Sequence, residues 1–146
     1  MKKLIGVVGL LAALLVAAVA YAAETYKVSS TLKPGLDVPR PRGATGAHGT
    51  FAGTFVESKT GATLKWKLTF GGLTGPALQA HIHQGKPGVS GNVIVPLCGP
   101  CHSGMTGTMH ITKAVVEAME KGSAYVNVHT KKNPAGEVRG QVKVAG

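Results

Sequence analysis

The sequence of 146 residues predicts an all-β fold, an antiparallel sandwich or barrel of about eight strands with one short helix. Two observations lead to this fold class. Short segments alternate between apolar and polar residues, and most of the 21 glycines fall in the stretches between those segments. Hydrophobic residues make up 44% of the chain and charged residues 15%, which excludes intrinsic disorder and suits one folded domain.

The clearest strand spans residues 63–70. Every second side chain in it is apolar and the others are threonine or lysine, so one face is expected to be buried and the other wet. A turn at residues 58–61 joins it to residues 49–56 as a hairpin. Six further strands are expected at Thr25–Leu32, Leu78–His83, Asn92–Leu97, Met105–Ile111, Tyr125–His129 and Glu137–Val144.

The one helix is predicted over residues 112–121. Thr112 is suited to cap its first turn, and Gly122 follows directly after the end. The apolar residues of this segment recur at helical spacing: Ala114, Val115, Ala118 and Met119. No arrangement of strands alternating with long helices is indicated, so a parallel α/β fold is not expected.

Residues 1–22 are predicted to be a secretory signal peptide, which leaves residues 23–146 as a single domain. Two lysines precede an uncharged apolar run, Leu4–Ala20, and Ala20-Tyr21-Ala22 forms a small-x-small cleavage pattern. The alternative is an uncleaved membrane anchor, because the run is nearly long enough to span a bilayer. No second hydrophobic span follows, so we expect a periplasmic or secreted protein in which a disulfide can form.

The charge of the chain does not indicate a nucleic-acid partner. The formal charge is +10, and removing residues 1–22 takes away two lysines and no acid, which leaves +8. The remaining basic residues are spread over strand faces and loop tips, and no aromatic residues alternate with them to stack on bases. The expected partner is therefore a metal ion, or a protein or polymer of the cell envelope or the extracellular space.

Three histidines are candidate metal ligands. His81 and His83 lie two residues apart in a predicted strand, so their imidazoles project from the same face. His129 ends another strand with a polar face and can supply a third nitrogen, as in copper or zinc sites. The alternative is a polar network that ties the strand ends to the turn at residues 133–136.

Cys98-Gly99-Pro100-Cys101-His102 has the spacing of several known sites. It matches the attachment motif of c-type haem, in which both cysteines form thioethers and His102 binds the iron. The distal iron ligand would then be Met105, Met109 or His110. The same tetrapeptide occurs in thioredoxins, but no helix follows it here. A short structural disulfide, a pair of inert thiols, or thiolate ligands to a metal would also fit this spacing.

Two motifs resemble the CHRD (chordin) domain. The first half of that domain resembles residues 80–85, Gly88, Gly91 and the strand 93–97, and its closing half resembles residues 125–130 and 133–141. Ala135 departs from the family, which usually has glycine there. The resemblance implies an all-β, immunoglobulin-like sandwich in exported proteins and implies little chemistry. In chordin the domain accompanies the binding of extracellular growth factors.

The His81-Ile82-His83 tripeptide also resembles a copper-ligand strand of Cu/Zn superoxide dismutase. Arg139 is the candidate for an arginine that guides superoxide, but no catalytic residue can be assigned from the sequence. We therefore expect an exported CHRD-domain binding protein with copper or zinc at His81, His83 and His129; no enzymatic activity is assigned, and superoxide dismutation stays open as an alternative. The alternatives are a c-type haem electron carrier built on Cys98, Cys101 and His102, and a cofactor-free structural or interaction module of the envelope.

Overall fold

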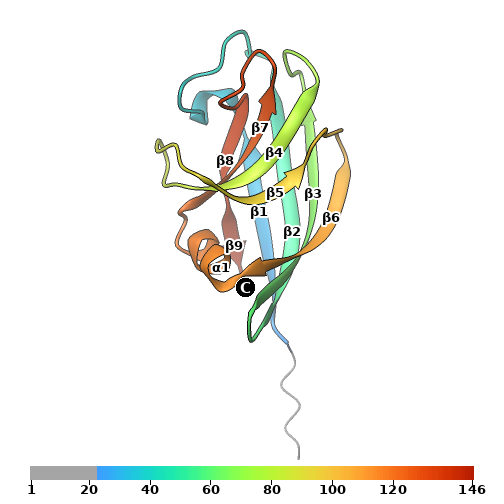
Figure 1. Ribbon diagram of the computed structural model, residues 1–146, viewed down its shortest axis with the longest axis vertical. Coiled ribbons are helices and arrows are strands. Elements are labelled where there is room, and N and C mark those ends of the chain that lie inside the picture. Colours follow the sequence, from blue (N-terminus) through green and yellow to red (C-terminus); the bar gives the residue numbers. More distant parts are fainter. Residues whose placement is uncertain (1–22) are drawn as a thin grey trace, which may run out of the picture.

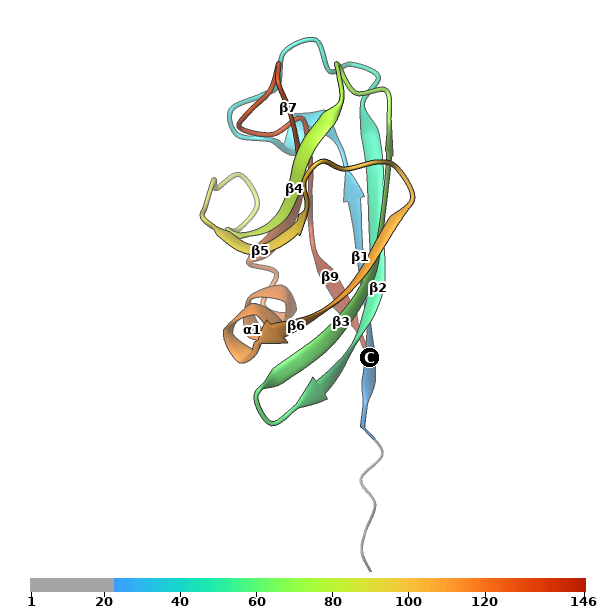
Figure 2. The same cartoon turned by 45° about the vertical axis from the view of Figure 1, so that its right-hand side comes forward.

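Two antiparallel sheets make up the computed structural model, which describes residues 23–146 (Figure 1). The strand order is β6-β3-β2-β1-β9 in the first sheet and β5-β4-β7-β8 in the second. The turned view shows the sheets as separate layers, with helix α1 at the opposite end of the sandwich from the top of β7 (Figure 2). The predicted signal peptide, residues 1–22, lies outside the described residues. The expected all-β sandwich is confirmed.

The first sheet contains the predicted hairpin. Its strands are β1 (Thr25–Leu32), β2 (His48–Ser58), β3 (Gly61–Gly71), β6 (Met105–Thr112) and β9 (Lys143–Ala145). In β3, Leu64 and Leu68 are fully buried and Trp66 is 5% exposed, while Lys65 and Lys67 are exposed. The alternation therefore marks the core face and the wet face of the first sheet correctly.

The second sheet consists of β4 (Ala77–Gln84), β5 (Val93–Cys98), β7 (Ala124–Thr130) and β8 (Val138–Gln141). Its inner face packs into the same core as the first sheet. The fully buried apolar side chains of this face are Ala80, Ile82, Ala124, Val126, Val128 and Val138. The alternate side chains of β4 and β7 project from the outer face, which is the face that carries the histidines.

Helix α1 (Lys113–Glu120) begins and ends as predicted. The hydroxyl of Thr112 accepts a hydrogen bond from the backbone N–H of Val115, at 3.4 Å, and caps the first turn. Gly122 has a φ of +66°, a conformation that glycine adopts without strain at a helix end. A 3₁₀ turn, η1 (Pro34–Leu36), was not predicted; it lies in the long connection between β1 and β2.

The prediction of a single strand over residues 137–144 was wrong. Residues 137–144 do not form one strand but two short strands, β8 and β9, which belong to different sheets, so the described chain has nine strands. The chain changes sheet at Val142, which is 2% exposed and whose N–H donates to the carbonyl of Ala124 at 2.9 Å. A Cβ on Gly140 would collide with the carbonyl oxygen of Thr31, so β8 approaches β1 at a glycine.

Candidate functional site

Strands β4 and β7 bring the three predicted histidines together. They are adjacent and antiparallel, with His81 opposite Asn127 and His129 opposite Gln79. The ring centroids of His81 and His129 are 5.0 Å apart, and those of His83 and His129 are 5.5 Å apart. One ligand atom from each ring lies within 4.8 Å of the other two. The i, i+2 spacing and the polar face of β7 therefore predicted a true cluster.

The nitrogen–nitrogen distances fit a metal-binding arrangement. His129 Nε2 lies 3.2 Å from His81 Nδ1 and 3.4 Å from His83 Nε2. Bonds of about 2.0–2.1 Å from imidazole to a tetrahedral zinc ion place neighbouring nitrogens about 3.3 Å apart. Two edges of the cluster have this length, and all three ligand atoms lie within 4.8 Å of one another, so the spacing is close to that of a three-histidine metal site.

Backbone carbonyls determine which ring nitrogen carries the proton in two of the histidines. His83 Nδ1 lies 2.9 Å from the carbonyl oxygen of Gly91, and His129 Nδ1 lies 3.0 Å from that of Pro134. A carbonyl oxygen only accepts hydrogen bonds, so both Nδ1 atoms donate. In the neutral rings both Nε2 atoms therefore carry lone pairs, and these face each other. Such orientation of a ligating histidine by a second hydrogen bond is a common property of metal sites.

Burial keeps the three imidazoles in the neutral form that binds metal. It lowers the pKa of His129 to about 4, where the hydrogen bond to Pro134 opposes the shift and the neighbouring His81 and His83 add to it. Burial also lowers the pKa of His81 and of His83 below the usual histidine value. Since ligation requires neutral imidazole, the cluster needs no deprotonation at neutral pH.

A stacked row of flat groups supports His83. Its ring lies parallel to the ring of Tyr125, with centroids 5.0 Å apart and an angle of 8° between the planes. The guanidinium of Arg139 lies over the Tyr125 ring, 3.4 Å from its centroid. Arg139 is 2% exposed and donates to the carbonyl of Lys86 at 2.9 Å. Arg139, the candidate named above for guiding superoxide, is therefore buried against the Tyr125 ring.

The loop after β4 completes the enclosure of His83. The hydroxyl of Tyr125 accepts a hydrogen bond from the N–H of Gly91 at 3.1 Å, and the carbonyl of the same glycine accepts from His83. A Cβ on Gly91 would collide with the carbonyl oxygen of Gln84, so the close approach of the loop requires glycine. Gly91 is thus a positioning residue, and its part in the site was not predicted.

A buried carboxylate anchors the end of the sheet next to the cluster. Glu137 is fully buried and accepts hydrogen bonds from the hydroxyl of Thr74 at 2.6 Å and from the side chain of Asn133 at 3.1 Å. It also accepts from the N–H of Thr74 and from the hydroxyl of Thr130. Burial opposes the ionisation of Glu137, but these hydrogen bonds outweigh it and hold its pKa below the usual value.

This network also positions His129. Asn133 accepts from the N–H of Arg42 at 2.6 Å and donates to the Arg42 carbonyl at 3.2 Å, which ties the β7–β8 turn to the β1–β2 connection. The same turn carries Pro134, whose carbonyl binds His129. A polar network to this turn was the predicted alternative to a metal site. The network uses Nδ1 of His129, whereas Nε2 faces His81 and His83.

A second buried carboxyl, Asp37, lies beside this turn. It is 3% exposed, and its oxygens have no hydrogen-bond partner among residues 23–146. A Cβ on Gly136 would meet both Asp37 and Asn127, so the carboxyl is packed against the turn. Burial raises the pKa of Asp37 to about 7, and the neighbouring Asn127 amide and the charge of Arg139 oppose the shift. The protonated form is therefore the better tolerated one in the folded protein.

Stability should fall as Asp37 ionises. Because its folded pKa is about 7 and the unfolded value is 3.8, the folded state binds more protons between these values and loses stability as the pH rises through them. We expect the free energy of unfolding of Asp37→Asn, relative to wild type, to increase by up to about 4 kcal/mol between pH 4 and pH 8. Urea titrations at several pH values measure this difference. A difference that stays constant with pH contradicts the expected ionisation.

The cysteines of the second predicted motif form a disulfide. Cys98 and Cys101 are joined at an S–S distance of 2.07 Å, and His102 is exposed. Met105 and Met109 are partly buried against the core, and His110 is exposed. Both sulfurs are used in the disulfide, so this arrangement offers no thiol for thioether bonds to haem or for a metal. Among the arrangements that the spacing allowed, the structure contains the disulfide.

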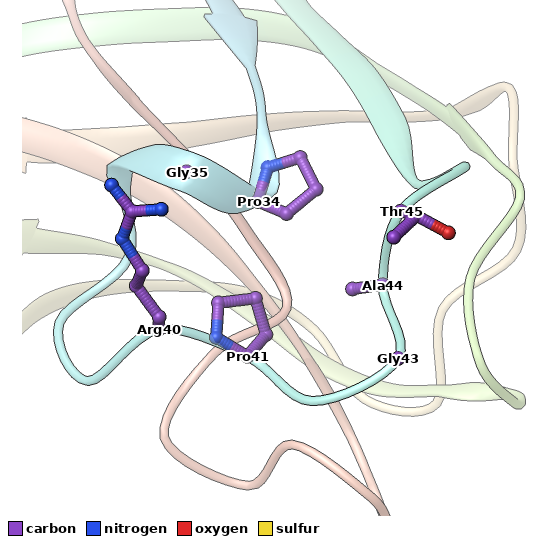
Figure 3. A pocket seen from close by; sticks show the side chains of 7 residues that line it. All are labelled: Pro34, Gly35, Arg40, Pro41, Gly43, Ala44 and Thr45. Carbon is purple, nitrogen blue, oxygen red and sulfur yellow. The ribbon is translucent and has the colours of Figure 1, made fainter.

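The connection between β1 and β2 surrounds a small open hollow of about 150 Å³ (Figure 3). Pro34, Gly35, Arg40, Pro41, Gly43, Ala44 and Thr45 line it. Figure 3 shows Arg40 beside the 3₁₀ turn and Thr45 on the opposite side. One cation and one hydroxyl among prolines and small residues do not form a catalytic set, so the histidine cluster remains the candidate site.

Comparisons with known proteins agree with the fold. Residues 28–142 match the family model of the CHRD domain. No curated protein and no solved structure matched the chain. Within residues 23–146, no helix has the length and apolar composition needed to cross a membrane. Since the match includes helix α1, all three histidines and every strand except β9, with β1 covered from residue 28, the chain belongs to the CHRD domain family.

Proposed function

We propose that this protein is an exported metal-binding protein that holds one copper or zinc ion through His81, His83 and His129. The observation that carries the proposal is the pair of Nε2 lone pairs on His83 and His129, which face each other at 3.4 Å. Two acceptors at this distance repel each other unless a cation or a proton lies between them. The pKa values of both histidines are lowered, so a proton between the two nitrogens is disfavoured. A bound metal cation is the remaining way to relieve the repulsion.

The ligand set limits the metal to ions that prefer imidazole. The group consists of three histidines, with no carboxylate or thiolate among them. Copper and zinc suit imidazole nitrogen, whereas magnesium and calcium prefer oxygen ligands. Three protein ligands leave a further coordination position on a four-coordinate ion, which a water or a small ligand can take.

Three features support an exported location. Residues 1–22 have the pattern of a signal peptide, and the resemblance to the CHRD family implies exported proteins. The disulfide between Cys98 and Cys101 is a bond that persists in oxidising compartments such as the periplasm or the extracellular space. In an exported protein the histidine cluster would meet metal ions outside the cytoplasm.

Metal analysis of the protein as isolated, together with thermal melting, tests the proposal. We expect one copper or zinc per chain, or a protein whose Tm rises when ZnCl₂ or CuSO₄ is added. At a free metal concentration about 100 times the Kd, the stabilisation of about 2.7 kcal/mol corresponds to a Tm higher by about 10 °C. MgCl₂ is the control and should leave the Tm unchanged. Absence of both stoichiometric metal and a metal-dependent Tm contradicts the proposal.

A further inference from the structure

The outer face of the first sheet carries positive charge and hydroxyl groups. Side chains that alternate with the core residues project from this face, and four of them are exposed lysines: Lys27, Lys65, Lys67 and Lys143. Most of the remaining outward positions on the sheet carry hydroxyls: Thr25, Ser29, Thr31, Thr50, Thr54, Thr63, Thr69, Thr106, Thr108 and Thr112. The histidine cluster belongs to the other sheet, so this surface is separate from the proposed metal site.

The lysines occupy two neighbouring rows across the strands. Lys27, Thr54, Lys65 and Thr108 are paired in register from β1 to β6. The next row runs from Lys143 through Ser29, Ala52 and Lys67 to Thr106. From the spacing of strands and residues, the Cα atoms of Lys27 and Lys65 are about 10 Å apart and those of Lys65 and Lys67 about 7 Å apart.

No acidic side chain neutralises this face. Of the six acidic residues, only Glu57 lies within the strands of the first sheet. Glu57 shares the inward parity of Phe55 and lines a hollow beside helix α1 with Lys113 and Glu117. The outward positions of β1, β2, β3, β6 and β9 therefore carry uncompensated positive charge, which attracts a polyanion.

An open hollow gives this face a place for an extended chain. It has a volume of about 550 Å³ and crosses β2, β3 and β6. Lys65 and Lys67 line it together with the threonines at positions 54, 106 and 108. Cations within reach of hydroxyl groups match a polymer that carries both carboxylates and hydroxyls, since lysine pairs with the carboxylate and threonine both donates and accepts hydrogen bonds.

The composition of the face favours a polysaccharide over a membrane or a nucleic acid. The large exposed hydrophobic residues of the described chain all lie outside the first sheet, so this face offers no large exposed apolar side chain for insertion into a bilayer; these residues are Leu36, Val38, Leu78, Val89 and Val93. The aromatic residues of the sheet have inward parity, and Trp66, which is among the residues lining the hollow, is only 5% exposed, so no ring is available to stack on bases. We propose that the outer face of the first sheet binds an acidic polysaccharide through Lys27, Lys65, Lys67 and Lys143.

Retention of the full folded protein on polygalacturonate beads in a rising NaCl gradient tests this proposal. We expect the wild type to be retained at low salt, and the variant K27Q/K65Q/K67Q/K143Q to bind at least about tenfold more weakly. The matched control is K59Q/K86Q/K131Q/K132Q, which removes the same charge at exposed positions outside this face and should bind within about twofold of wild type. All eight lysines are exposed, so both variants should keep the wild-type Tm.

Three outcomes would overturn the proposal. Equal weakening in both variants would show attraction to net charge alone. If the wild-type protein is not retained at low salt, it does not bind polygalacturonate. Tighter binding to phosphatidylglycerol vesicles or to duplex DNA than to polygalacturonate, with the same dependence on the four lysines, would assign the face to lipid or to nucleic acid instead.

Discussion

His129→Ala should weaken the binding of Zn²⁺ or Cu²⁺ by at least about 100-fold. Its Nε2 is the nitrogen shared by both short contacts of the cluster, at 3.2 Å to His81 and 3.4 Å to His83. Without it the two remaining nitrogens belong to one strand and have no ligand from β7. Loss of a partner that only orients a ligand costs 10–100-fold in metal affinity, so loss of a ligand should cost at least as much.

The other two histidines should not be equivalent. His83 is fixed by the carbonyl of Gly91 and by the ring of Tyr125, whereas His81 has no backbone hydrogen bond among those found for its ring. An immobilised ligand loses less freedom on binding, so we expect His83→Ala to weaken binding more than His81→Ala does. Competition against a chelator of known affinity measures all three variants.

The matched control for these variants is His102→Ala. His102 is exposed and lies beside the disulfide, outside the cluster, so its removal should leave metal affinity unchanged. Melting of each variant in the presence of EDTA separates a structural role from a ligand role. If His129→Ala binds metal as the wild type does, the histidine site is excluded.

Glu137→Ala should lower the free energy of unfolding by about 3–5 kcal/mol, the largest stability effect that we expect. The carboxylate is fully buried and satisfies two donors of Thr74, the hydroxyl of Thr130 and the side-chain amide of Asn133. Its removal leaves these donors without an acceptor in a region that excludes water. Urea unfolding at pH 7 measures the loss.

The effect of Glu137→Ala should depend on pH in a defined direction. The folded pKa of Glu137 lies below the usual value, so its ionisation stabilises the folded state above the unfolded pKa of 4.5. This stabilisation is lost as the pH falls through the folded pKa, and the gap between variant and wild type should narrow in acid. Glu57→Ala, at an exposed strand end, is the control and should change stability by less than about 0.5 kcal/mol. Equal losses in both variants contradict the role of the buried network.

The strands of the first sheet were predictable because burial on one side imposes alternation. The register of β2 and β3 follows from their apolar faces, with Phe51 opposite Leu68 and Phe55 opposite Leu64. The change of sheet near the end of the chain was not predictable in this way. Val138, Gly140, Val142 and Val144 continue the same alternation through the crossing, so the pattern holds although the partner strands change.

The ligand set of the candidate site was predictable, but the groups that orient it were not. His81 and His83 share a face by their spacing, and the polar face of β7 pointed to His129. The carbonyls of Gly91 and Pro134 have no residue signature, because every residue carries a carbonyl. Their places depend on how the loops fold back on the sheet.

The cysteine motif shows the same limit. The spacing of Cys98 and Cys101 is shared by haem attachment sites, redox sites and short disulfides. The surroundings distinguish these sites: a redox site has a helix after the motif, a haem site needs an apolar pocket, and a short disulfide needs neither. Here the motif lies in a short connection between β5 and β6, which closes on itself through the disulfide.

The division of the last residues between two sheets has a consequence for when the protein can fold. β8 pairs with β7, and β9 pairs with β1, the first strand of the described residues. A chain whose residues 138–145 are still held in a ribosome or an export channel therefore has two incomplete sheets, with unpaired edges on β1 and β7. β1 and β7 gain their last neighbours only when residues 138–145 are free to pair, so completion of both sheets is tied to the release of this segment. If the protein is exported, as proposed above, and crosses the membrane unfolded, this dependence delays completion of the sandwich until the segment has crossed the membrane.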